Sequence, residues 1–131
     1  MRLLLDTHAW IWAAMEPSRL GKKTAAILID PGSEVWLSPI SVAEVLSLHT
    51  KRKLPMITDV EKWLDEALSR VPLRDAPVTR EVAREIGRFK LPHRDPVDVL
   101  LVATARVFGL TLVTADRNII SSGAVAVIPN D

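Results

Sequence analysis

The segment His93–Asp116, HRDPVDVLLVATARVFGLTLVTAD, decides the fold class of this chain of 131 residues. Asp95 and Pro96 predict a helix start, with Asp at the N-cap and Pro at the first helical position. Apolar residues then recur at helical spacing until Gly109, which ends the helix. The run Leu110–Thr114 is short, apolar and β-branched, as is typical of a strand that is covered on both faces. The segment therefore predicts a helix that packs back on its own strand.

Strands and helices alternate in the same way along the rest of the chain. We expect strands at 2–5, 34–37, within 71–78, at 110–114 and at 124–128. We expect helices at 7–15, 21–29, 58–68, 79–89 and 96–108, a helix that opens within 38–41 and continues through 48, and one helical turn at 117–120. This alternation predicts an α/β fold, with a central, mostly parallel sheet flanked by helices on both faces, in a single domain over residues 1–131.

The composition narrows the class of protein. Hydrophobic residues make up 48% of the chain, which favours a folded core over disorder. The net charge of +1 gives no bulk electrostatic argument for a nucleic-acid or membrane partner. No apolar run approaches the ~20 residues that a membrane span needs. The chain has no cysteine, which excludes a disulfide framework and a thiolate metal site and fits a reducing cytoplasm.

Four acidic residues fall where predicted strands end or helices begin. Asp6 and Asp116 follow the first and fourth strands, and the working residues of parallel sheets lie at these carboxyl ends. Asp98 lies in the first turn of the helix before the fourth strand, and Glu44 lies near the start of the helix after the second. Each has a purely structural reading, because acids are favoured as helix caps and in first turns. Ser41 and Glu44, for example, have the spacing of a capping box.

Taken together, the four acids indicate a metal site at one rim of the sheet. Carboxylates gathered at one rim repel one another, and a divalent cation removes that repulsion. Oxygen ligands favour Mg²⁺ or Mn²⁺, and His8, His49 and His93 lack close metal-ligand spacing. Asp95 is a fifth acid nearby, for which the readings as a helix cap and as a ligand both stay open.

Four segments, in order, resemble the acidic motifs of the PIN-domain family. They are LLLDTH at 3–8, SVAEV at 41–45, HRDPVDVLLVATA at 93–105 and LVTAD at 112–116. More narrowly, they resemble the VapC-type toxins of bacterial and archaeal toxin–antitoxin pairs. The resemblance implies a Mg²⁺- or Mn²⁺-dependent endoribonuclease, in which a metal-activated water attacks an RNA phosphodiester bond. It places four residues in the catalytic and metal-binding site: Asp6, Glu44, Asp98 and Asp116.

The same resemblance implies further contacts and partners. Thr114 matches a hydroxyl position that commonly precedes the last acid, and Asp95 matches an acid that a subset of the family carries. The family also implies a VapB-type antitoxin protein that covers the site, and a homodimer of the toxin.

Basic residues near the acids are the candidates for holding RNA. Arg88, Lys90 and Arg94 precede the third acidic motif, and with Thr114 they form our predicted substrate-binding set. Lys51–Lys53 form a second basic group, after the helix that carries the second motif. The alternative for both groups is a solvated helix end, where Lys and Arg are favoured in any case.

The tryptophans offer stacking surfaces for bases, but most lie in apolar segments that are typical of a core. Trp10 and Trp12 point about 200° apart on their predicted helix, so the two side chains do not face the same core. We therefore expect one of them at the surface.

Other classes of protein also place acids at strand ends. A receiver-like, phosphoryl-accepting domain needs paired acids after the first strand and a lysine near a late one, and this chain lacks both. A haloacid-dehalogenase-type phosphatase needs Asp-x-Asp after the first strand, which is also absent. A non-catalytic binding module, whose acids are all caps, stays open and predicts no specific Mn²⁺ binding.

Overall fold

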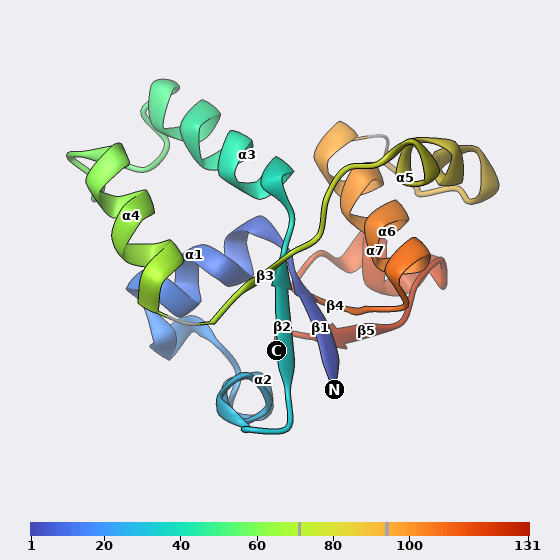
Figure 1. Cartoon of the computed structure of the whole chain (residues 1–131), viewed down its shortest axis with the longest axis horizontal. Helices are drawn as coiled ribbons and strands as arrows, with labels where there is room; N and C mark the ends of the chain where they lie inside the picture. Colours follow the sequence, from blue (N-terminus) through green and yellow to red (C-terminus); the bar gives the residue numbers. More distant parts are fainter. Residues whose placement is uncertain (71, 94) are drawn as a thin grey trace.

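The computed structural model of this protein describes residues 1–70, 72–93 and 95–131. Within them, five strands form one sheet in the order β3-β2-β1-β4-β5, and every neighbouring pair is parallel (Figure 1). The strands are β1 (Arg2–Leu5), β2 (Glu34–Leu37), β3 (Arg74–Asp75), β4 (Thr111–Thr114) and β5 (Val127–Pro129). The predicted α/β class with a parallel sheet is therefore confirmed.

Helices cover both faces of the sheet (Figure 1). They are α1 (Thr7–Met15), α2 (Lys22–Ile29), α3 (Pro39–Thr50), α4 (Val60–Arg70), α5 (Arg80–Glu85), α6 (Pro96–Phe108) and α7 (Arg117–Ser122), with short 3₁₀ turns η1 (Pro17–Arg19) and η2 (Ile86–Arg88). Helices α1 to α4 contribute to one core, and α6 and α7 contribute to the other, against which Ile40 at the start of α3 also packs. No helix in the described ranges has both the length and the apolar character needed to cross a membrane.

The two inner strands feed both cores because their side chains alternate between the two faces. In β1, Leu3 and Leu5 belong to one core and Leu4 to the other, and none of the three is more than 3% exposed. In β4, Leu112 and Val113 divide between the cores in the same way. Burial on both faces explains why these strands read as continuous apolar runs.

Helix α6 begins and ends as its sequence predicts. Asp95 is the N-cap, and its Oδ1 accepts hydrogen bonds from the amides of Val97 and Asp98. Gly109 ends the helix in the left-handed conformation, with φ of 65°. Residues 101–105 are buried on all sides, because α3, α5 and β4 all contact α6. The apolar stripe that the spacing predicts is thus only part of the buried surface.

The start of α3 corrects the predicted capping box. Ser38 is the N-cap, and its hydroxyl accepts a hydrogen bond from the amide of Ile40 at 3.1 Å. Pro39 takes the first helical position, which its fixed φ favours. Ser41 is fully buried inside the helix, and Glu44 is its sixth residue. Reading Ser41 and Glu44 as a capping box was therefore wrong.

Two elements after α4 are shorter or later than expected. The predicted edge strand within 71–78 is confirmed only at Arg74 and Asp75. Pro72 and Pro77 flank these two residues and have no amide hydrogen to donate to a neighbouring strand. Val71 lies outside the described residues. The predicted helix at 79–89 divides into α5 and η2, and its residue 83, expected inside, is exposed.

The last helix and strand are also displaced from their predicted limits. Helix α7 extends to Ser122, beyond the single turn expected, and Gly123 ends it in the left-handed conformation. The chain consequently pairs with β4 only from Val127 onward.

Trp10 and Trp12 leave α1 on different sides, as predicted. Trp10 is 2% exposed and packs edge-on against Trp63, with ring centroids 5.2 Å apart. Trp12 is only partly buried, and the guanidinium of Arg19 lies 4.7 Å from its ring centroid.

Candidate acidic site

Asp6 and Asp116 leave neighbouring strands at the same edge of the sheet. Leu5 of β1 pairs with Val113 of β4, and the amide of Asp6 donates to the carbonyl of Val113 at 3.1 Å. The buried hydroxyl of Thr114 accepts a hydrogen bond from the amide of Asp116 at 3.0 Å and also hydrogen-bonds the side chain of Asp6. The topology therefore brings the first and last predicted acids to one rim, joined by Thr114.

Asp98 faces this rim from the first turn of α6. Its pKa is raised to about 7, first because partial burial disfavours the charged form. Repulsion by neighbouring carboxylates raises this pKa further, in the order Asp95, Asp116, Asp6 and Glu44. The four predicted acids and Asp95 thus share one electrostatic neighbourhood. We call these five residues the acidic cluster.

Asp6 is the second carboxylate of the acidic cluster whose pKa is raised in the folded protein. Burial raises its pKa, and the hydrogen bond from Thr114, the amide of Ala9 and the nearby His8 oppose that rise. Glu44, on α3, adds a smaller upward push by repulsion. The charged form of Asp6 is therefore disfavoured unless a proton or a cation is near.

The acidic cluster has no ion-pair partner in the part of the chain that the structure describes. The salt bridges there involve other acids, Glu16, Glu34 and Glu85. The cluster consists only of oxygen donors that repel one another, and this donor chemistry fits a hard divalent cation such as Mg²⁺ or Mn²⁺.

Three members of the acidic cluster also cap helices. The Oδ1 atoms of Asp6, Asp95 and Asp116 accept amide hydrogen bonds in the first turns of α1, α6 and α7, at 2.7–3.3 Å. The structural reading of these three as caps is therefore confirmed, but the caps use only one oxygen of each carboxylate. As the side chains stand, no three Asp, Glu or His groups in residues 1–70, 72–93 and 95–131 form a ready set of metal ligands. The cluster is thus crowded without being a preformed cage.

The basic residues predicted to contact RNA differ in their exposure and in whether an acid already pairs with them. Lys90 is exposed between η2 and α6. Arg88 is already paired, because its guanidinium donates to Glu85 at 2.9 Å. Arg94 lies outside the described residues. Lys51–Lys53 are exposed at the end of α3.

The sequence reasoning missed a buried hydroxyl pair behind the acids. Thr7 Oγ1 donates to Ser41 Oγ at 3.1 Å, and the two residues are 2% and 0% exposed. This bond joins α1, directly after Asp6, to α3, three residues before Glu44. The signal that was available is the proline after Ser38, which marks Ser38 as the cap and leaves Ser41 to the helix interior.

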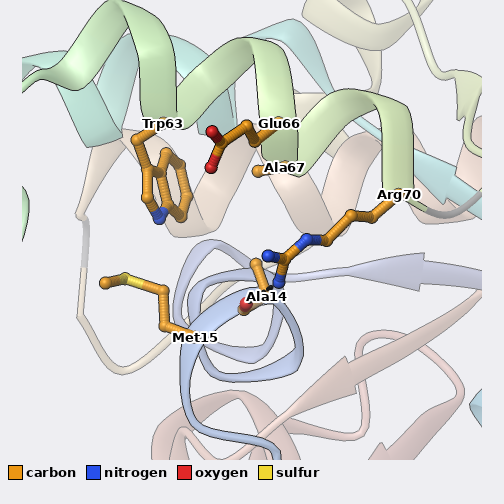
Figure 2. Close-up of a pocket in the computed structure, with 6 residues that line it drawn as sticks. All are labelled: Ala14, Met15, Trp63, Glu66, Ala67 and Arg70. Atoms are coloured by element: carbon orange, nitrogen blue, oxygen red, sulfur yellow. Dashed lines mark hydrogen bonds between the residues drawn. The ribbon is translucent and has the colours of Figure 1, made fainter.

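Hollows also occur away from the acidic cluster. Figure 2 shows one between α4 and α1, where Trp63 faces Met15 and Arg70 reaches Ala14 across the gap. Its volume is about 250 Å³. Arg70 closes one end by donating to the carbonyl of Ala14 at 3.0 Å. A mostly apolar groove of about 230 Å³ shares Ala14 and Arg70 with it and extends to α2. None of the predicted acids lines either space.

Known proteins are similar to this chain in sequence and in fold. The family model described as PIN domain matches residues 3–123. The chain is 33% identical over 120 residues to Ribonuclease VapC22 of Mycobacterium tuberculosis. This match covers 89% of this chain and 88% of the relative. A chain in the crystal structure of VapBC2 from Rickettsia felis, bound to a DNA fragment from its promoter, superposes with a TM-score of 0.69 at 16% identity, covering 100% of both chains. One from VapBC-5 of Mycobacterium tuberculosis gives 0.62 at 20% identity, covering 98% of both.

Proposed function

Because the chain belongs to the PIN-domain family, we propose that it is a cytoplasmic, Mg²⁺- or Mn²⁺-dependent endoribonuclease, the toxin of a VapBC-type pair. The observation that carries the proposal is Asp98, whose pKa is raised to about 7 by burial and by four surrounding acids. The ribonuclease name of the relative at 33% identity supports RNA as the substrate. The family match spans every member of the acidic cluster, which supports placing the reaction there.

The proposed ion site consists of Asp6, Asp98 and Asp116, with Glu44 completing the shell or orienting a water. Their repulsion and their lack of salt bridges within the described ranges support this choice. A bound ion supplies the Lewis acidity that activates water and neutralises phosphate charge. Asp95 is the additional candidate ligand, because its cap bonds use only Oδ1.

Thr114 and Lys90 have supporting roles in the proposed site: Thr114 positions the acids, and Lys90 attracts the RNA. Thr114 links the two acids, because its hydroxyl accepts from the backbone amide of Asp116 and hydrogen-bonds the Asp6 side chain. Lys90 is exposed, and no acid in the described residues pairs with its ammonium group. In the proposed complex this ammonium contacts a backbone phosphate of the RNA.

The proposed partner is a protein antitoxin of the VapB type, and the toxin itself forms a homodimer. Solved chains with this fold come from VapBC complexes, which supports the pairing. The apolar groove beside α1 and α2 is a suitable surface for a protein segment. Trp10 lines this groove, and its Nε1 is buried without a hydrogen-bond partner in the described structure.

Incubation with total RNA tests the activity directly. Purified protein should cut RNA in Mg²⁺ or Mn²⁺ but not in EDTA, and mapping of the new ends should show internal cleavage. Asp6→Asn and Asp98→Asn should abolish cleavage while far-UV circular dichroism stays unchanged. Asp65→Asn, an exposed acid on α4, is the matched control and should cut normally. Normal cleavage by both Asp6→Asn and Asp98→Asn would rule the proposal out.

A further inference from the structure

A separate pocket of about 270 Å³ lies between one face of α1 and the segment that connects α3 to α4. Its lining combines aromatic, cationic and thioether side chains, among them His8, Trp12, Met15, Arg19, Lys53 and Met56. We call it the α1 pocket. It begins beside the acidic cluster, because His8 lies two residues after Asp6. The charge of His8 opposes the rise in the pKa of Asp6 that burial causes.

Trp12 lies among the aromatic and cationic side chains of the α1 pocket. The guanidinium of Arg19 lies 4.7 Å from its ring centroid, and the His8 ring lies 5.9 Å away at 50°. Arg19 also pairs with Glu16 at 3.9 Å, and both side chains remain more than half exposed. Aromatic rings and Arg planes are the surfaces on which single-stranded RNA bases stack. The α1 pocket thus offers a stacking platform that is open to solvent.

Arg52, the residue before Lys53 of the α1 pocket, holds a conformation that glycine normally takes. Its φ of 58° lies in the left-handed region, directly after α3. Amides of Arg52 and Lys53 donate to the carbonyls of His49 and Leu48, as in the turn that usually ends a helix on glycine. Retaining Arg there is unfavourable for the backbone, and residues kept in such a conformation concentrate at functional sites. Both cationic side chains are exposed.

The segment that carries these cations is fixed in place. The His49 ring nitrogen Nε2 lies 3.0 Å from the carbonyl of Ile57, and Leu54 and Ile57 are buried. The charges of Lys53 and Arg52 are therefore presented by an anchored loop, which reduces the entropy lost when a ligand binds.

We propose that the α1 pocket is an RNA subsite in which a base stacks on Trp12 and the adjoining phosphates contact Lys53 and Arg52. This inference rests on the proposed ribonuclease function. Asp6 caps α1, and Trp12 lies ~9 Å further along it as axial rise at 1.5 Å per residue, so one short helix carries both the acid and the proposed stacking surface. The cationic edge matches phosphate, whereas the groove beside α2 is mostly apolar and suits a protein segment.

Binding without cleavage tests the subsite. The Asp98→Asn background in EDTA is titrated into a fluorescein-labelled single-stranded RNA of about 12 nucleotides, and the dissociation constant is read from anisotropy. Adding Trp12→Ala should weaken binding by between about 5-fold and about 150-fold, the range for one stacked base, and Trp12→Phe should retain most of the affinity. Trp63→Phe, in the hollow of Figure 2, is the aromatic control and should bind like the background.

Arg52→Gly gives a second test in which stability and binding move in opposite directions. Relief of the left-handed strain should raise the melting temperature, while loss of a phosphate contact should weaken binding and reduce the salt dependence, the slope of log K against log salt, by about 0.7. Lys62→Gln, which removes an exposed charge from α4, should change neither affinity nor slope. An RNA with an abasic spacer in place of the stacked base should bind the Trp12→Ala variant and its parent equally.

Several results would overturn the subsite. Unchanged RNA affinity in both Trp12→Ala and Arg52→Gly would do so, even if the parent chain cleaves RNA and the proposed function stands. Unchanged RNA affinity with weakened binding of a partner protein would assign the α1 pocket to that partner instead. If the parent chain neither binds nor cuts RNA in the presence of Mn²⁺, the proposed function and the subsite fail together.

Discussion

Asp98 is the residue whose chemistry the fold alters most clearly. Its carboxyl lies in the first turn of α6, where the helix dipole favours a negative charge, yet burial and four other acids raise its pKa to about 7. Repulsion and desolvation therefore outweigh the dipole. A bound proton and a bound divalent cation each remove the same repulsion between carboxylates, so we expect them to compete for Asp98.

This competition gives the metal-free protein a distinct pH dependence. Because the pKa of Asp98 is about 7 in the folded protein and the ordinary pKa of an aspartate is 3.8, the folded state binds more protons than the unfolded chain between these values. The free energy of unfolding contributed by Asp98 is therefore highest below the lower value and is lost as the pH rises toward 7. Urea unfolding in EDTA across this range measures the slope.

Asp98→Asn isolates this contribution. The free energy of unfolding is measured against pH for the variant and for the parent, and the first profile is subtracted from the second. This subtraction cancels the contributions of the other titrating groups, including Asp6, whose pKa is also raised by burial. The difference should decline with rising pH, whereas Asp65→Asn should leave the parent profile unchanged in slope. Parallel profiles for Asp98→Asn and the parent would show that Asp98 titrates normally in the folded protein.

At the scale of elements, the buried bond between Thr7 and Ser41 fixes α1 against α3. Thr7→Val removes the donor and leaves the Ser41 hydroxyl buried without that partner, which should cost about 1–3 kcal/mol in the free energy of unfolding. Thr7→Ser should restore most of the loss. The double variant with Ser41→Ala should lose less than the sum of the single changes, because no unpaired hydroxyl remains.

Thr50 supplies the control for this cycle. Its hydroxyl donates to the carbonyl of Leu46 on an exposed face of α3, so Thr50→Val should change stability by no more than about 0.5 kcal/mol. Strict additivity of the Thr7 and Ser41 changes in urea unfolding would contradict the coupling.

The end of α6 offers another test at this scale. Gly109 has φ of 65°, and an added Cβ would lie 3.7 Å from the nearest atom, a nitrogen of the Arg2 guanidinium, so only backbone strain opposes a side chain there. Gly109→Ala should therefore lower the free energy of unfolding by about 1–2 kcal/mol. Gly87 has an ordinary φ and no atom within 4 Å of an added Cβ, so Gly87→Ala should be neutral or stabilising. Equal effects of the two changes in urea unfolding would count against the strain.

At the scale of the whole molecule, the sequence predicted the parallel sheet because its inner strands are buried on both faces and read as apolar runs. The buried segments 3–5 and 112–113 carry this signal strongly. The edge strand β3 does not, because two exposed residues between prolines have no side-chain pattern to read. The start of α3 was misread because two serines lie three residues apart, and only the proline between them distinguishes the cap from the buried partner.

The same limit applies to the candidate site. Parallel topology predicts that Asp6 and Asp116 share a rim, and the structure confirms this placement. It does not predict which oxygen of each carboxylate caps a helix, nor the contacts of Thr114 and Ser41, because these depend on side-chain packing between distant segments. The α1 pocket escaped notice for a similar reason: His8, Arg19 and Lys53 meet only in the fold.

The proposed function depends on a divalent cation that the acidic cluster holds. Isothermal titration of Mn²⁺ into the purified chain near neutral pH measures this without any assumption about the RNA. We predict saturable binding by the parent and by Asp65→Asn, and an affinity at least about 10-fold weaker for Asp98→Asn. Equal Mn²⁺ affinities for the parent and Asp98→Asn, or no binding above background in either, would contradict the account and leave the acids as helix caps alone.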